Sequence, residues 1–390
     1  MGKLDGVRVL DAGLLVQGPQ AALTMLEWGA DVIKIELPGF GDQARWLPIG
    51  RDDHRSAWFM AFNRGKRSVT VDFRVPEGRE VFLRLVERAD VVISNFKPGT
   101  MEGWDLGYAE VSARNPRIVY ATSSCFGSQG PDARREGADL SAQAAGGLIS
   151  TTGGDDTAPS AIGATIADHV AGQNLLAGIL AALFERTRTG RGQEVETSLL
   201  GGQVWAQAGE LTRYLLSGEM SGPGGRTHPM IPGIYGMFPT SDGWIAIVGV
   251  AGPARDLFYR TVGRPDLIDR FDQLLYFEDD KAELWPILNE VFASKSTKEW
   301  CELLGAAGLR FSPIRDHGQV ASDPGVSANG YISSAEEPGT GVVRPPVRFT
   351  QPLGPARGEI PELGQHTEEV LLESGFTWEE IASLSAQGAI

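Results

Sequence analysis

The chain has 390 residues, of which 42% are hydrophobic and 22% charged, and it carries a formal net charge of −15. This length exceeds the usual size of a single hydrophobic core and predicts two domains, while the negative charge argues against a nucleic-acid-binding surface, because a phosphate backbone demands a basic face. No apolar run approaches the length of a membrane span and the first residues lack the apolar core of a signal peptide, so we expect a cytoplasmic protein with no membrane partner.

The first part of the chain alternates short apolar runs with helical patterns. Runs typical of buried parallel strands occur at residues 7–10, 32–35, 69–71, 91–93 and 118–121. Helical patterns lie between them at residues 21–28 and 77–86, the second after the helix-starting Pro76. This alternation predicts an α/β fold with a Rossmann-like, doubly wound parallel sheet.

A nicotinamide-dependent enzyme is the obvious rival for such a pattern. It should show a Gly-x-Gly-x-x-Gly turn after the first strand. The turn here has glycines at positions 13 and 18, which breaks that spacing, and Pro19 stands where the helix should open. The sequence therefore disfavours a dinucleotide dehydrogenase.

Asp168 stands just ahead of a longer apolar stretch that ends near Gly190. Residues repeating at helical spacing in this stretch are Leu175, Leu176, Ile179, Leu180, Leu183 and Phe184. Gly190 follows basic residues and is a helix stop signal, so Asp168 lies at a helix start. On composition alone the favoured interpretation is a helix cap, which is worth about 1 kcal/mol; the other is a functional anion.

The composition changes at residues 216–225, which are rich in glycine and predict a flexible loop. Residues 234–239 and 244–248 then predict a β-hairpin, and helical patterns follow at residues 254–262, 281–293, 297–304, 368–372 and 378–384. We expect a large α/β domain at 1–215, a smaller α+β domain at 216–325, and a carboxyl-terminal segment at 326–390 that returns to the large domain.

Metal and disulfide sites are not expected. Cys125 and Cys301 are too few and too far apart for a disulfide framework or a thiolate metal site, and Cys125, which follows a predicted strand, is interpreted as an inert buried thiol. The five histidines never fall at metal-site spacings: His54, His169, His228, His317 and His366.

Two groups of cations stand out in this acidic chain. Arg64, Lys66 and Arg67 flank a glycine and lead into a predicted strand, which favours a phosphate-binding role over a solvated surface. The second group, formed by Arg186, Arg188 and Arg191, is as consistent with a surface or subunit contact as with an anion site.

Asp168 also belongs to a longer pattern, with Gly163 before it and Gly178 and the Arg-Thr-Gly-Arg-Gly-Gln stretch of residues 188–193 after it. This block resembles the segment that carries the nucleophilic aspartate in family III CoA-transferases, the CaiB/BaiF family, which includes formyl-CoA transferase and carnitine CoA-transferase. Similar stretches occur in the expected order at residues 4–11, 18–19, 29–36, 63–68, 89–92, 95–99, 115–121 and 363–371.

The resemblance implies an enzyme that moves CoA from an acyl-CoA to a carboxylic acid, with Asp168 as covalent nucleophile. The thioester would pass through a mixed anhydride and then an aspartyl-CoA thioester. A helix start would keep the Asp168 carboxylate ionised and supply amide donors for the developing oxyanion.

The resemblance also implies where the CoA substrate binds, with no tightly bound cofactor. Val16 and Gln17 lie in the first strand-to-helix loop, where the family binds CoA; Gln17 is a candidate supporting residue, although it stands one place later than the active-site glutamine of formyl-CoA transferase. Further expected CoA contacts are Val71, Arg74, Asn95, Phe96, Lys97, Arg64, Lys66 and Arg67. The arginine that usually precedes the Leu-Gly pair at positions 106 and 107 is missing.

Residues 222–225 stand where the family carries a mobile glycine loop. Gly224 and Gly225 are therefore candidate supporting residues in a lid that excludes water from a hydrolysable anhydride. A simple domain linker is an equally good interpretation. His228 and Met230, just beyond, are candidates for the acyl pocket.

The same family fold hosts α-methylacyl-CoA racemases, which abstract an α-proton and are the alternative function. Those enzymes place a histidine base where this chain has Ala138. His169 adjoins Asp168 but points about 100° around the helix, so it is a poor substitute for an opposed acid and base. A third possibility, a binding or inactive subunit of a hetero-oligomer, is disfavoured by the presence of Asp168.

Members of the family form interlocked homodimers, and the resemblance implies the same assembly here. A succinyl-CoA-like donor and a small or dicarboxylic acceptor are common in the family. No residue of this sequence identifies the two acids.

Overall fold

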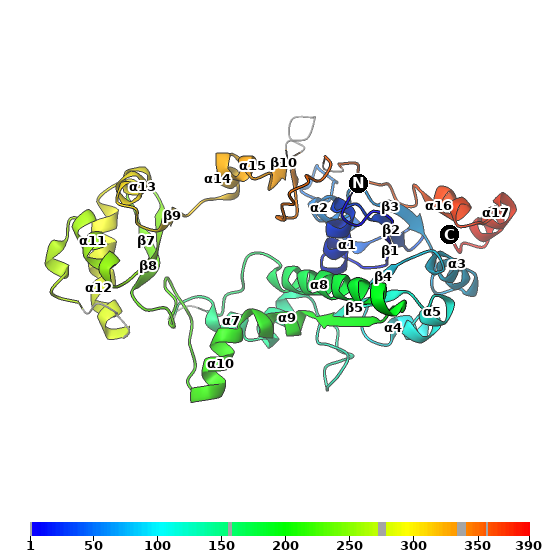
Figure 1. Cartoon of the computed structure of the whole chain (residues 1–390), viewed down its shortest axis with the longest axis horizontal. Coiled ribbons are helices and arrows are strands. Elements are labelled where there is room, and N and C mark those ends of the chain that lie inside the picture. Colours follow the sequence, from blue (N-terminus) through cyan, green and yellow to red (C-terminus); the bar gives the residue numbers. More distant parts are fainter. Residues whose placement is uncertain (1, 155–157, 272–277, 334–340, 356–357) are drawn as a thin grey trace. The chain divides into compact units, whose positions relative to one another are not determined.

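The computed structural model describes residues 2–154, 158–271, 278–333, 341–355 and 358–390, and the chain forms two compact units (Figure 1). The first unit comprises Met1–Gly146, Gly163–Ala206 and Pro324–Ile390, and the second comprises Gly147–Ile162 and Gln207–Asp323. The second unit thus includes residues 147–162, which the sequence analysis places in the large domain, and its second segment begins at 207 and not at 216.

The first unit is built on a six-stranded parallel sheet in the order β3-β2-β1-β4-β5-β6. Its strands are β1 (Arg8–Asp11), β2 (Asp31–Glu36), β3 (Arg67–Thr70), β4 (Val91–Ser94), β5 (Val119–Ser124) and β6 (Glu194–Ser198). This is the strand order of a Rossmann-like doubly wound sheet, so the predicted fold class is confirmed. Strand β6 was not predicted, because Glu194 and Glu196 alternate along an edge strand that has no apolar run.

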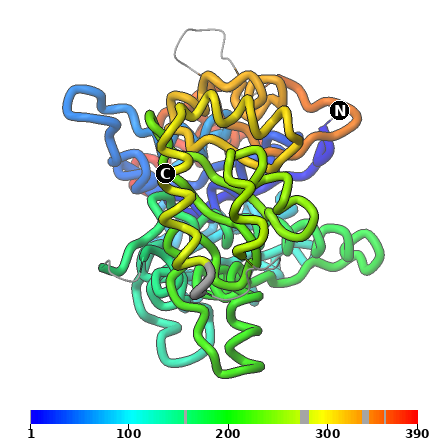
Figure 2. Tube along the Cα trace, turned by 90° about the vertical axis from the view of Figure 1, so that its left-hand side faces the viewer, coloured from blue at the N-terminus to red at the C-terminus, as the bar shows by residue number. Residues whose placement is uncertain are grey.

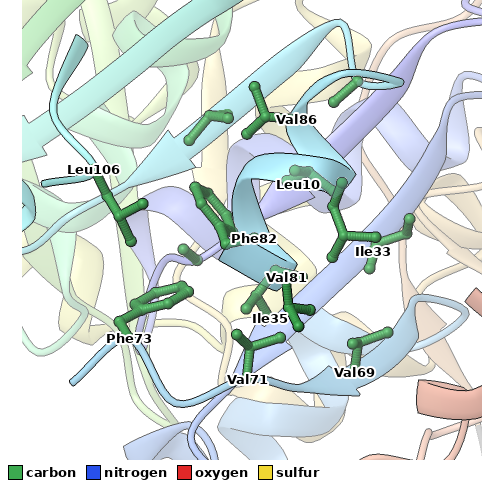
Figure 3. Close-up of a cluster of buried hydrophobic side chains, with 14 of the residues drawn as sticks. Leu10, Ile33, Ile35, Val69, Val71, Phe73, Val81, Phe82, Val86 and Leu106 are labelled. Carbon is green, nitrogen blue, oxygen red and sulfur yellow. The ribbon is translucent and has the colours of Figure 1, made fainter. Parts of the chain in front are cut away.

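Helices cover both faces of this sheet because successive side chains of each strand point to opposite faces. On β1, Leu10 belongs to a core shared with Val81 and Phe82 of α3 (Figure 3), whereas Val9 belongs to a core shared with α1 and α8. Elements of this unit are α1 (Gln17–Glu27), η1 (Gln43–Trp46), α2 (Ala57–Asn63), α3 (Pro76–Val86), α4 (Thr100–Gly103), α5 (Tyr108–Arg114), α6 (Asp139–Ala145), α8 (Ile166–Thr189), α9 (Leu199–Ala206), α15 (Pro324–Ala328), β10 (Ile332–Ser333), β11 (Val342–Val343), α16 (Thr367–Glu373) and α17 (Trp378–Ala386).

Helix α1 begins at Gln17, four residues before the predicted start. Pro19 is accommodated because the amides of a first helical turn need no intrahelical acceptor.

Residues after Pro324 return to the first unit, as the sequence predicted for the carboxyl-terminal segment; they are orange to red in Figure 2. The amide of Asp72 donates to the carbonyl of Ala389 (2.9 Å), and the amide of His366 donates to the carbonyl of Ser68 (2.9 Å). The sheet edge at β3 is therefore covered by the end of the chain.

The second unit is a small α+β structure with an antiparallel sheet in the order β7-β8-β9. Strands β7 (Ile234–Pro239) and β8 (Trp244–Val250) form the predicted hairpin. The core is aromatic, with Phe292 packed between Phe238 and Trp300. The remaining elements are α7 (Leu148–Thr151), α10 (Ala208–Ser217), α11 (Pro253–Thr261), η2 (Pro265–Leu267), α12 (Glu278–Ala293), α13 (Thr297–Ala306), β9 (Phe311–Pro313) and α14 (His317–Ala321).

Helix α8 is long and apolar enough by composition to cross a membrane, and it is the one such helix among the described residues. The expectation that no apolar run approaches that length is therefore wrong for α8. Its apolar side chains have partners within the unit, since Leu175, Leu176 and Ile179 belong to the core shared with α1 and the sheet.

A network of buried charges lies beneath the loop that follows β1. The Lys34 ammonium is 2.7 Å from a carboxylate oxygen of Asp42 and 3.9 Å from one of Asp11, and all three side chains are fully buried. Burial alone would lower the pKa of Lys34, but the carboxylates of Asp11, Asp42 and Glu36 outweigh it and raise this pKa above its usual value. The charged form of Lys34 is thus the one that the fold requires.

Replacing Lys34 by methionine should destabilise the protein by about 3–5 kcal/mol, because it leaves the Asp42 carboxylate buried without its cation. The measurement is the free energy of unfolding from urea denaturation. Arg55→Met is the matched control: it removes an exposed ion pair with Asp53 and should leave the midpoint unchanged. Equal midpoints for all three proteins would contradict a structural role for the buried network.

Candidate active site

The order of strands reverses between β1 and β4, and in an open parallel sheet this switch point is where ligands bind, beyond the carboxyl ends of the strands. The loop after β1 is held there by side chains from elsewhere. Asn95 accepts a hydrogen bond from the Leu14 amide (2.7 Å) and donates one to the Leu14 carbonyl (2.8 Å). Asp42 accepts from the Leu15 amide (3.0 Å), and Leu15 has a φ of +61°, an uncommon conformation for a residue with a side chain.

A cavity of about 210 Å³ opens beside this loop, at the carboxyl ends of β1, β2 and β3. The Phe96 and Trp104 rings, 5.4 Å apart and edge to face, form part of its apolar wall. The lining residues are Ala12, Leu14, Ile35, Glu36, Leu37, Phe40, Gly41, Gln43, Val71, Asp72, Phe73, Arg74, Phe96 and Trp104. Three of the expected CoA contacts, Val71, Arg74 and Phe96, therefore line one cavity.

Two of the expected cations lie on the surface. Arg74 forms a two-point ion pair with Asp72, and Lys97 lies 3.1 Å from Glu136. Ion pairs at such exposed positions contribute little to stability. The Arg74 and Lys97 side chains are 63% and 50% exposed.

The other expected phosphate partners serve the fold instead. Arg64 is 1% exposed and pairs with Glu27, and Lys66 is 2% exposed and bonds to Asp11 (2.7 Å). Arg67 pairs with Asp31 and with carboxylates of α16. This corrects the sequence interpretation of the cluster, because Arg64 and Lys66 are neutralised by interior carboxylates and Arg67 is paired with carboxylates nearer the surface.

Val16 and Gln17, expected at the CoA site, are both buried at the start of α1. The carboxamide oxygen of Gln17 accepts a hydrogen bond from the Ser123 hydroxyl on β5. Three residues further on, Gln20 reaches α8, where its side-chain oxygen lies 2.9 Å from Nδ1 of His169. The start of α1 is thus tied to the sheet and to the start of α8.

Asp168 lies in the first turn of α8, as predicted, but the amides of that turn are already occupied. One carboxylate oxygen of Asp139, on α6, accepts hydrogen bonds from the amides of Ala167 (2.7 Å) and Asp168 (3.2 Å). The Ile166 amide donates to the Ala164 carbonyl, and the His169 amide donates to that of Thr165. The expectation that these amides are free to donate hydrogen bonds to an oxyanion is therefore wrong.

The charge state of Asp168 also differs from the expectation. Burial, and secondarily the negative charge of Asp139, raise the pKa of Asp168 from its usual value to about 7. A helix start lowers the pKa of an acid only while its amides and dipole act on that acid. Here Asp139 takes those hydrogen bonds and adds a like charge, so Asp168 is a basic carboxylate.

The neighbouring reactive groups are poor competitors for Asp168. Burial is the main effect that lowers the pKa of His169, whose ring contacts Phe62. Burial is likewise the main cause that raises the pKa of the Cys125 thiol to about 11, which leaves it protonated and unreactive at neutral pH.

In the second unit, the glycine-rich segment is fastened to residues near α7. The Gly224 amide donates to the Thr151 carbonyl (2.9 Å), and the Gly225 amide donates to the Gly153 carbonyl (2.7 Å). Gly225 has a φ of +55°, which favours glycine. Of the candidates beyond it, His228 lies 3.1 Å from Glu210.

Within the described ranges, no group of three or more potential metal ligands gathers. Asp139 and Trp104 are the site residues that the sequence analysis missed. Asp139 directly follows Ala138, but its contact with α8 spans 29 positions, a pairing that spacing alone does not reveal.

These features define an α/β enzyme with a ligand cavity at the carboxyl edge of a parallel sheet and a partly buried, basic carboxylate at a helix start. The chain belongs to CoA-transferase family III, whose family profile matches residues 4–367. It is accordingly a family III CoA-transferase.

Three similar proteins illustrate the relationship. The chain is 32% identical to the succinyl-CoA:mesaconate CoA-transferase of Haloarcula hispanica, over 96% of this chain and 97% of that protein. It is 31% identical to the human succinyl-CoA:glutarate CoA-transferase, over 95% of this chain and 85% of that protein. The crystal structure of a CaiB/BaiF family protein from Brucella suis superposes with a TM-score of 0.85 at 34% identity, covering 96% of this chain and all (100%) of that one.

Replacing Asp168 by asparagine should stabilise the folded protein at pH 8 and not at pH 4. The pKa of Asp168 is raised on folding, so the folded state binds this proton more tightly, and stability falls as the pH rises from 3.8 to about 7. After discounting for partial exposure, we expect a gain of about 2 kcal/mol at pH 8. Urea denaturation at both pH values measures it, with the exposed Asp132→Asn as a control. A variant less stable than the parent at pH 8 would show that burial does not strain the carboxylate.

Proposed function

We propose that this enzyme transfers CoA between two carboxylic acids through a covalent intermediate on Asp168. The observation that carries the proposal is the position of Asp168: a partly buried carboxylate at the start of α8, within the segment matched by the family profile, with a pKa raised to about 7. A carboxylate that basic is a strong nucleophile while still substantially ionised at neutral pH.

The proposed reaction has two symmetrical halves. The Asp168 carboxylate attacks the donor thioester carbonyl, and the carbon–sulfur bond breaks to release CoA thiolate and leave a mixed anhydride. The thiolate then attacks the aspartyl carbonyl, which forms an aspartyl-CoA thioester and releases the donor acid. The acceptor carboxylate repeats these steps in reverse and leaves as the new acyl-CoA.

A carboxylate nucleophile suits this exchange energetically. The donor acid that is released and the acceptor acid that is taken up are both carboxylates, so the net exchange keeps the free energy of the thioester, and each intermediate is itself an activated acyl group. A serine ester would lose that free energy, and water would hydrolyse the anhydride, so the site must exclude water.

The CoA moiety is proposed to occupy the cavity beside the β1 loop. Val71, Phe96 and Trp104 offer apolar and aromatic surface for the adenine ring. Arg74 and Lys97 are exposed cations that can exchange Asp72 and Glu136 for phosphates. Small dicarboxylic acids, with succinyl-CoA as donor, are the proposed substrates, because the two named relatives carry such acids in their names.

Incubation with succinyl-CoA should add a covalent group to Asp168, read as a mass increase of the intact protein. Hydroxylamine should convert the adduct to an aspartyl hydroxamate, which peptide mapping places at position 168. Asp168→Ala should abolish the adduct and lower transfer to glutarate or mesaconate by at least about 10³-fold.

Cys125→Ser is the control for a competing nucleophile and should retain the adduct. An adduct that survives in Asp168→Ala would refute the proposal. Absence of any adduct across a panel of acyl-CoAs, with deuterium uptake at the α-carbon of a branched acyl-CoA, would favour the racemase.

A homodimer is also proposed, together with a cytoplasmic location. Leu215 and Leu216, at the end of α10, are 79% and 83% exposed, and Tyr214 beside them is also exposed. Large apolar side chains exposed together mark an interaction surface. A second copy of the chain is the proposed partner, as the family resemblance implies.

Sedimentation velocity should give twice the chain mass of 41.8 kDa. Leu215→Glu combined with Leu216→Glu should shift the protein toward monomer, because two charges would be buried without partners. The double change Leu215→Ala and Leu216→Ala serves as a milder comparison. A parent protein that sediments as a monomer would contradict the assembly.

A further inference from the structure

Asp139 is the feature near Asp168 that the reaction described above does not use. Asp139 is the first residue of α6. One of its carboxylate oxygens accepts hydrogen bonds from the amides of Ala167 and Asp168 at the start of α8 (2.7 and 3.2 Å). The other oxygen accepts a hydrogen bond from the Gln143 carboxamide, one helical turn later (2.6 Å). Asp139 is thus fixed at both oxygens, and it fixes the turn that presents Asp168.

We propose that Asp139 is the positioning residue for the nucleophile: it holds the first turn of α8 in place, and its negative charge makes the Asp168 carboxylate a stronger base and nucleophile. This inference rests on the proposed covalent role of Asp168. Asp139 itself forms no bond with substrate and acts through its neighbour.

The two effects have different physical origins. The hydrogen bonds satisfy amides that the helix leaves without acceptors, as an N-cap side chain does, although this carboxylate comes from another helix. The charge effect arises because a second carboxylate nearby disfavours ionisation of the first. A substitution can therefore remove the charge and keep the acceptor.

The other groups around Asp168 cannot supply this effect. The start of α1 contributes the uncharged Gln17 and Gln20, and helix α9 carries no ionisable side chain. The Cys125 thiol after β5 is protonated at neutral pH, with a pKa of about 11.

On β6, which also packs against α8, Glu196 is bonded to Ser128, and Glu194 pairs in the sheet with Tyr120 of β5. His169 lies on α8 itself, and burial lowers its pKa. Among the described residues, Asp139 is the charged group whose repulsion acts on Asp168.

The first test needs no substrate. We expect Asp168→Asn to stabilise the parent protein at pH 8 and to stabilise the Asp139→Asn background less, because the repulsion between the two charges is already gone. This double-mutant cycle isolates the interaction between residues 139 and 168. Equal stabilisation in both backgrounds would overturn the proposal, whatever the reaction of the enzyme.

The second test is kinetic, with succinyl-CoA as the probe and adduct formation as the readout. Asp139→Asn keeps an oxygen for the two amides, and the Gln143 carboxamide can turn to meet the new amide group. Its acid limb in the pH profile should move down by about one pH unit. Its rate at pH 8 should fall about threefold, by analogy with thiolates, whose reactivity falls by that factor per pKa unit.

Asp139→Ala removes charge and acceptor together and should lower adduct formation by at least about tenfold. Asp132→Asn, an exposed carboxylate of the same chain region, is the control and should leave the profile unchanged. An acid limb at the same pH in Asp139→Asn and the parent overturns the proposal. Adduct formation that persists in Asp168→Ala defeats the covalent reaction itself, while the substrate-free cycle still decides the coupling.

Discussion

The fold of the first unit depends on charges that are buried together beneath the β1 loop. Lys34 and Lys66 neutralise Asp11, and Lys34 also neutralises Asp42. The same carboxylates accept hydrogen bonds from the Gly13 and Leu15 amides of that loop, so the ion pairs also fix the loop conformation. Buried ion pairs gain little net stability because desolvation offsets their attraction, but a mispaired one is costly. The network therefore enforces a single loop conformation at the ligand edge of the sheet, including the left-handed backbone of Leu15.

In contrast to the carboxylates paired with Lys34 and Lys66, Asp168 lies near a like charge, that of Asp139. It is a partly buried carboxylate, and a second carboxylate acts on it. The amides of Ala167 and Asp168 donate their hydrogen bonds to that neighbour, Asp139. Such an arrangement sacrifices stability and creates reactivity, as is common where a group must react. The network around Lys34 and the Asp168 carboxylate lie in the same unit.

Much of the fold was predictable because its signals are local. Continuous apolar runs, such as residues 91–93, predict five of the six strands of the parallel sheet. The charged edge strand β6 contains no such run. The place of Asp168 at a helix start was predictable for the same reason. Its charge state was not, because that depends on Asp139, and neither were the internal partners of Arg64 and Lys66, which lie 37 and 55 positions away. Tertiary contacts decide whether a cation meets solvent or an interior carboxylate.

The return of the chain to β3 has a consequence for synthesis on the ribosome. The sheet strands are made first, the larger segment of the second unit follows between α9 and α15, and the segment that covers β3 is made last. A nascent chain therefore carries a complete parallel sheet with one edge uncovered while the second unit is still emerging. Uncovered strand edges are sites of aggregation. The segment that contains helices α16 and α17 covers the β3 edge, so its synthesis removes this site of aggregation from the chain.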